Sequence, residues 1–168
     1  MPEIIIPGVQ YEVSAAYADG KAFRISEEFT LANTGNAIVI KFVANVPFKL
    51  TDQSLVAHAG DVRMRAIAGA TESGSFSTVI TSFGKNRWVD RPRPYYTSQV
   101  SLTTGGLISG GTRSETLRAK TAGASGQASS INGRIQNFRS LPAGTYYLEF
   151  VALTNSCEFT FALEWEEK

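Results

Sequence analysis

The sequence predicts an all-β protein, a single β-sandwich or jelly-roll-like domain. Several short segments alternate apolar and polar residues with a period of two, the pattern of strands with one buried face. Turn residues such as Gly, Asn, Ser and Pro separate these segments at short intervals, which is typical of sandwiches and barrels. The length of 168 residues suits one domain.

The clearest pattern lies at the C-terminal end. Residues 144–153 and 157–165 read as two strands joined by a turn at 154–156, and we expect them to pair as a β-hairpin. One face of the second strand is apolar and is expected to be buried; it carries Cys157, Phe159, Phe161, Leu163 and Trp165. The other face is expected to contact solvent; it carries Glu158, Thr160, Ala162, Glu164 and Glu166.

Further strands are predicted along the rest of the chain. Residues 37–44 are β-branched and almost entirely apolar, as in a central strand that is buried on both faces. The other expected strands are 22–31, 61–68, 75–82, 95–104 and a short one at 134–140.

Two segments depart from this pattern. Residues 1–20 form an extended N-terminal arm in which Ile4, Ile5 and Ile6 lie between two prolines, and this arm is either an edge strand or a segment that docks on a partner. Within the sandwich domain, 21–168, the Gly/Ser-rich stretch 105–133 is predicted as a long loop insertion. Its part 114–120 favours one or two helical turns.

Composition narrows the function classes. A formal net charge of +1 argues against a general polyanion binder, and a hydrophobic fraction of 43% argues against a disordered chain. The single cysteine, Cys157, excludes an intrachain disulfide and favours folding in a reducing cytoplasm. We expect neither a signal peptide nor a membrane partner, because a basic leader and a long apolar run are both missing from the sequence.

The residues that carry chemistry are few. His58 is the only histidine, and although Asp52 and Asp61 are near it in sequence, we expect it on the surface or at a strand end. Cys157 is expected to be an inert core thiol. The carboxylates of the last strand are interpreted as a solvated face rather than as a glycosidase pair. We therefore expect a protein that is not an enzyme and that uses no metal or cofactor.

The densest polar cluster lies at 84–96, where arginines and aromatic residues alternate and two prolines favour an extended backbone. This composition is typical of protein–protein contacts, but it also fits an ordinary loop, a single-stranded nucleic-acid groove or a sugar site. With the arm, this cluster supplies the candidate partner-binding residues: Ile4, Ile5, Ile6, Lys85, Arg87, Trp88, Arg91, Arg93, Tyr95 and Tyr96.

The order of these parts resembles the small accessory virion proteins of tailed bacteriophages, in particular head decoration (cement) proteins. The resemblance is carried by 23–31, 85–87, 110–113, 141–150 and 161–165. It implies a virion protein, made in the host cytoplasm, that forms homo-oligomers, commonly trimers. It also implies binding to the major capsid protein or other virion proteins and no specific nucleic-acid partner. The alternatives are a tail, connector or receptor-binding component, and a carbohydrate-binding module.

Overall fold

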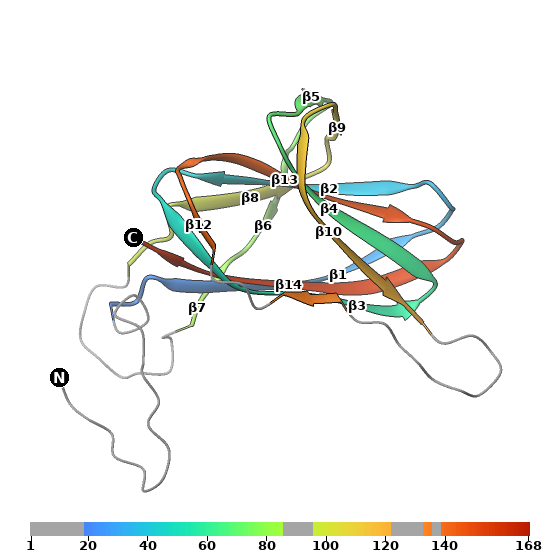
Figure 1. Cartoon of the computed structure of the whole chain (residues 1–168), viewed down its shortest axis with the longest axis horizontal. Helices are drawn as coiled ribbons and strands as arrows, with labels where there is room; N and C mark the ends of the chain where they lie inside the picture. The colour runs from blue at the N-terminus through green and yellow to red at the C-terminus, as the bar shows by residue number, and fades with distance from the viewer. Residues whose placement is uncertain (1–18, 86–95, 122–132, 136–138) are drawn as a thin grey trace, which may run out of the picture.

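The structure is a computed structural model that describes residues 19–85, 96–121, 133–135 and 139–168. In these residues the chain is all-β: two antiparallel six-stranded sheets face each other, and a two-stranded ribbon projects from one of them (Figure 1). This architecture confirms the predicted fold class at the level of a β-sandwich. No helix in the described residues has the length and apolar character needed to cross a membrane.

Sheet I has the strand order β11-β3-β14-β1-β7, and β12 also pairs with β3. Its long strands are β1 (Ala22–Leu31), β3 (Phe48–Ala59) and β14 (Cys157–Glu167), and its short ones are β7 (Phe83–Gly84), β11 (Gly133–Ile135) and β12 (Arg139–Leu141). The C-terminal strand β14 lies in the middle, paired with β1 on one side and β3 on the other. The centre of sheet I therefore joins the two ends of the described chain.

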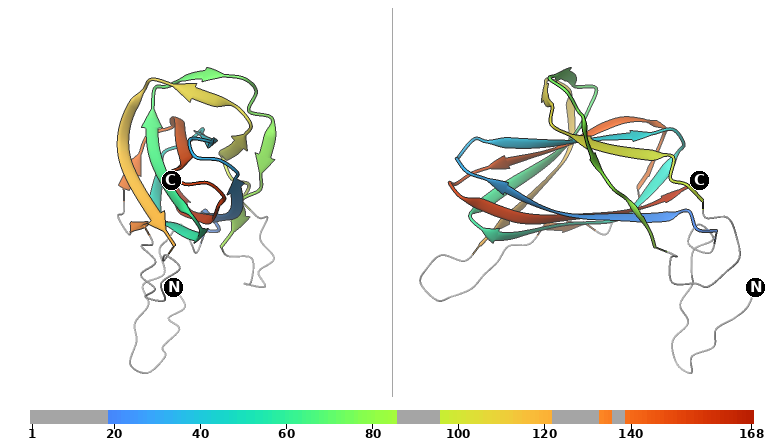
Figure 2. Two further views of the ribbon diagram at one scale, coloured as in Figure 1. Left: turned by 90° about the vertical axis from the view of Figure 1, so that its right-hand side faces the viewer. Right: turned by 180° about the vertical axis from the view of Figure 1, so that it is seen from behind.

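Sheet II has the strand order β10-β4-β13-β2-β8-β6. Its strands are β2 (Ala37–Ala44), β4 (Asp61–Ala68), β6 (Thr78–Ile80), β8 (Val100–Thr104), β10 (Thr112–Lys120) and β13 (Gly144–Ala152). The chain passes from sheet II to sheet I between β6 and β7 (Figure 2). This crossing closes one side of the sandwich with short strands, which limits the length of exposed sheet edge.

The core between the sheets is rich in aromatic residues. The Phe150 ring of β13 lies 4.9 Å from the Phe161 ring and 5.3 Å from the Phe159 ring, both on β14. Trp165 is fully buried and meets the Phe42 ring edge-on at 5.6 Å. The predicted alternation of the last strand is confirmed, because each of its five apolar residues is at most 2% exposed.

The predicted C-terminal hairpin is wrong. Strands β13 and β14 follow each other in sequence but belong to opposite sheets, so residues 153–156 carry the chain across the core. Ser156 takes a positive φ of 56° in this link, a conformation that few residues other than glycine adopt. The physical reason is that the apolar faces of both strands bury more surface by packing against each other than by lying side by side.

The stretch 105–133 is not one long loop, and the helical turns expected at 114–120 are absent. Strands β9 (Leu107–Ser109) and β10 occupy its first half, while residues 122–132 lie outside the described part. In β10, Leu117 and Ala119 are buried and Arg118 and Lys120 are exposed. This period of two, together with pairing to β4, selects a strand over a helix.

Strand β3, twelve residues long, has no counterpart in the sequence prediction. Its alternation changes phase at a bulge, where Thr51 is the extra residue opposite Glu164 and Trp165. Phe48 faces the core before the bulge, whereas Leu55 and Ala57 face it afterwards. A parity change of this kind hides a strand from a search for strict alternation.

The remaining strands follow the prediction with shorter bounds. Residues 22–31, 37–44 and 61–68 are strands as expected, and β2 is central with Val39 and Ile40 buried on opposite faces. The strands expected at 75–82 and 95–104 shorten to β6 and β8, and the segment 134–140 overlaps two short strands, β11 and β12.

A small second core covers the outer face of sheet II. The ribbon formed by β5 (Thr71–Ser73) and β9 projects above this face (Figure 1). Beneath it Val39, Ile67 and Tyr147 are buried, with Phe76 and Ile108 packed against them. The Tyr147 hydroxyl donates a 2.6 Å hydrogen bond to Glu72, and burial together with this carboxylate raises the pKa of Tyr147 to about 12. The ribbon is thus held by both apolar and polar contacts.

Replacing Phe161 by alanine should lower the free energy of unfolding by about 3–5 kcal/mol, because the fully buried ring leaves a cavity between the sheets. Chemical denaturation of the purified protein measures this change. Val79→Ala is the control, since Val79 is 73% exposed and its truncation should change stability by no more than about 0.5 kcal/mol. Equal losses in the two variants would contradict the placement of β14 in the core.

Candidate partner-binding end

One end of the sandwich gathers the described residues that border both candidate partner-binding segments. The start of β1, the strand β7 and the end of β14 lie at this end (Figures 1 and 2). The Lys85 amide donates to the Ala22 carbonyl at 2.8 Å, and the Glu167 amide donates to the Lys21 carbonyl at 2.9 Å. Residues 21 and 22, which follow the arm, are therefore hydrogen-bonded to Lys85 at the start of the basic-aromatic cluster and to Glu167 on the C-terminal strand.

A buried carboxylate organises this end. The Glu167 side chain is 1% exposed, and both of its oxygens accept hydrogen bonds. Ser98 Oγ and Trp165 Nε1 donate to its Oε1 at 2.5 and 3.2 Å, and the Gln99 amide donates to Oε2 at 2.9 Å. These donors come from both sides of the core, since Trp165 is on β14 and Ser98 precedes β8. Glu167 thereby fixes the chain just after the basic cluster to the end of sheet I.

Tyr96, the last residue of the basic-aromatic cluster, is anchored at the same place. Its ring lies 6.1 Å from the Phe23 ring, and the Lys21 ammonium lies 5.4 Å from its centroid. Burial, the charge of Glu167 and a hydrogen bond to Glu167 raise the pKa of the Tyr96 hydroxyl. The hydroxyl is therefore a neutral donor at physiological pH.

Lys85, the first cation of the cluster, is also fixed. Its ammonium forms an ion pair with Glu164 on the outward face of β14. Lys85 and Tyr96 are the two candidate residues of the cluster that the structure describes, and both contact β14. Lys85 binds Glu164 on the outward face of this strand, and Tyr96 binds Glu167 on the inward face. The other candidates, Ile4, Ile5, Ile6, Arg87, Trp88, Arg91, Arg93 and Tyr95, lie outside the described residues.

The residues considered for catalysis are not brought together. His58 is exposed on a bulge of β3, and its Nε2 lies 2.6 Å from the Thr160 hydroxyl, as expected of a surface histidine. Cys157 is fully buried with its Sγ 3.1 Å from the Asp61 carbonyl oxygen. Among the described residues no group of three or more His, Cys, Asp or Glu side chains is placed to hold a metal ion.

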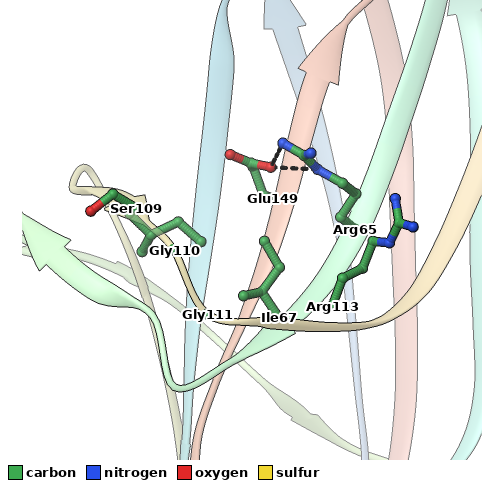
Figure 3. Close-up of a pocket in the computed structure, with 8 residues that line it drawn as sticks. Arg65, Ile67, Ser109, Gly110, Gly111, Arg113 and Glu149 are labelled. Carbon is green, nitrogen blue, oxygen red and sulfur yellow. Dashed lines mark hydrogen bonds and ion pairs between the residues drawn. The ribbon is translucent and has the colours of Figure 1, made fainter.

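A second polar region, a hollow of about 440 Å³, lies at the foot of the ribbon on sheet II. Figure 3 shows Arg65 and Glu149 pointing toward each other, with Arg113 extending beside Arg65. Arg65 Nε donates to Glu149 Oε2 at 2.7 Å. Gly111 lines this hollow, and its position requires glycine because φ is +84° and a Cβ there would lie 2.7 Å from the Ile67 side chain.

Sequence analysis missed Glu167 and this hollow. Arg63 and Arg65 alternate with Val62 and Met64, which favours an outward position, but Glu149, the carboxylate that pairs with Arg65, comes from a distant strand. Glu167 continues the phase of the buried face after Trp165, but sequence analysis ended the strand at 165 because a carboxylate is rarely buried without partners, and its partners come from distant segments.

Replacing Glu167 by alanine should destabilise the protein by about 1–3 kcal/mol, because its buried donors lose their acceptor. Thermal and chemical denaturation measure this effect. Glu158→Ala, an exposed carboxylate on the same strand, is the matched control and should shift stability by less than about 0.5 kcal/mol. An E167A variant as stable as E158A would show that the carboxylate does not organise this end.

Comparison with known proteins finds no family model, no curated protein and no solved structure that matches the chain.

Proposed function

We propose that the protein is a structural virion protein that decorates an assembled phage head and stabilises it. The N-terminal arm and the basic-aromatic cluster grip the major capsid protein or a neighbouring virion protein. The observation that carries this proposal is that Lys21, Lys85 and Tyr96, which border the two segments, are joined at one end of the sandwich. Two segments anchored at one place are suited to engage one partner together.

The physics of decoration fits a rigid sandwich. A subunit that binds only the assembled shell stabilises it by mass action, and no chemical step is required. Repetition of a weak contact over a lattice adds avidity when the copies are linked, as in the homo-oligomer that we propose. The aromatic core and the Glu167 network hold the anchoring end fixed, so binding loses little free energy to ordering of these anchors.

The experiment that tests the proposal is to locate and count the protein in purified particles. Cryo-electron microscopy of the parent particle should show density on the outer capsid lattice, and quantitative mass spectrometry should give a copy number that matches the lattice. A few copies confined to the tail would assign the protein to the tail instead. Absence from the particle would reject a virion role.

Removal of residues 1–9 should leave the sandwich folded and weaken binding to assembled heads. The expectation follows because all strands of the described sandwich lie beyond this segment. Circular dichroism melting checks the fold, and co-sedimentation with heads that lack the protein checks binding. An unfolded product would show that the arm belongs to the core.

Replacing Arg91 and Arg93 by glutamine should reduce binding to heads by about tenfold or more, since two cations of an interface are lost, and should change the melting temperature little. Ser26→Glu with Thr30→Glu is the matched control, because it makes the same change in net charge at exposed positions of β1. If both double variants bind equally well, the cluster is an ordinary loop.

A further inference from the structure

The outer face of sheet II carries an excess of positive charge on two adjacent strands. We call this set of residues the basic stripe: Arg63 and Arg65 on β4, with Arg113, Arg118 and Lys120 on β10. In the β4–β10 register Arg118 lies directly opposite Arg63, and Lys120 lies opposite Asp61. Because Val62, Met64, Leu117 and Ala119 are buried, the intervening cations point away from the core.

Two carboxylates on this face neutralise only part of the charge. Arg118 donates to both oxygens of Asp61, with Nε to Oδ1 at 2.9 Å, and this bond lowers the pKa of Asp61 below its usual value. Arg65 directs both Nε and Nη2 at the single oxygen Oε2 of Glu149. Within the described parts of the chain, no ion pair forms with Arg63, Arg113 or Lys120.

This arrangement is unfavourable for the isolated sandwich. Like charges directly opposite each other on neighbouring strands repel, as do Arg63 and Arg118. Arg63 Nε is also buried and has no hydrogen-bond partner in the described structure. A buried donor without an acceptor is destabilising, and an external anion on this face would offset the repulsion between the two guanidinium groups.

We infer that the basic stripe binds an extended acidic segment of a partner protein. Arg63 and Arg65 occupy alternate positions of one strand, so their Cα atoms are about 6.6–6.8 Å apart. Alternate side chains of an extended peptide have the same spacing, so acidic residues at positions i and i+2 face successive arginines. The hollow beside Arg113, with Ile67 and Ile108 in its lining, receives an apolar side chain at the end of such a segment (Figure 3).

The stripe favours a peptide over a nucleic acid. Asp61 and Glu149 lie among its cations and would repel a phosphate backbone, which carries a charge at every unit. A peptide can place neutral residues opposite these carboxylates and acidic ones opposite Arg63, Arg65 and Arg113. The face already uses guanidinium–carboxylate pairing twice, at Asp61 and at Glu149, which is the chemistry that the partner would extend.

The test measures binding of a fluorescently labelled peptide in which Glu and Ser alternate, the alternating peptide, to the full chain by anisotropy at low ionic strength. The wild-type protein should bind it, and binding should weaken as salt is added. Arg113→Glu should reduce the affinity by about tenfold, since Arg113 is exposed and its loss removes a free cation of the stripe. Arg24→Glu is the matched control, because it makes the same charge change at an exposed position of β1 on sheet I and should leave the affinity within about twofold.

Three results would overturn the inference. They are no binding of the alternating peptide by the wild-type protein, equal loss of affinity in R113E and R24E, or R113E-sensitive binding of a single-stranded oligothymidylate that is tighter than binding of the alternating peptide. Arg63→Met offers a second check, because the apolar end of methionine takes the place of the buried unpartnered Nε: the change should weaken binding of the alternating peptide while leaving the protein at least as stable. The assay contains no virion component, so it succeeds or fails independently of the proposed decoration role.

Discussion

The packing of β14 against β13 is the contact on which the rest of the structure depends. Phe159 and Phe161 meet Phe150 across the core, and Trp165 meets Phe42, so one strand of sheet I buries its aromatic face against two strands of sheet II. Rings of this size dominate the apolar area removed from water in a domain of this length. The sheets hold their relative position because these rings interlock.

The same strand links the core to the candidate partner-binding end. Trp165 and Glu167 alternate with Glu164 and Glu166, so β14 presents an aromatic ring and a carboxylate to the interior and acidic residues to the exterior. The interior carboxylate fixes the chain after the basic cluster, and the exterior one holds Lys85. The core and the anchoring of both partner-binding segments thus rest on a single strand.

Local sequence patterns specified which residues are buried, but they did not specify partners. The alternation of β1, β4 and β14 and the apolar run of β2 are written in consecutive residues, and the structure confirms them. Whether β13 and β14 pair or face each other depends on which arrangement buries both apolar faces, and no short window contains that information. Sequence analysis missed β3 for a related reason. Thr51 is an extra residue only in relation to the paired strand β14, so the bulge that shifts the alternation of β3 cannot be recognised from β3 alone.

The residues of the candidate sites likewise fall into those that a local pattern indicates and those that only the fold brings together. The arginines of β4 stood out by their alternation, whereas those of β10 lay in a stretch whose glycine content predicted a loop. That Arg63 faces Arg118 follows only from the pairing of β4 with β10, and that the buried Glu167 finds hydrogen-bond donors follows only from its contacts with residues 98 and 99. Charge clusters and buried polar groups that result from contacts between distant segments can be recognised only once the fold is known.

The position of β14 has a consequence for biosynthesis. Its two neighbours, β1 and β3, emerge from the ribosome long before it does, and each has to keep a pairing edge open until β14 is made. Sheet I therefore assembles only after β14 has left the ribosome, through contacts between segments far apart in the sequence, which is a slow class of folding event. Until then the nascent protein exposes unpaired, apolar strands, and shielding by a chaperone or by a second nascent copy would decide how much of it escapes aggregation.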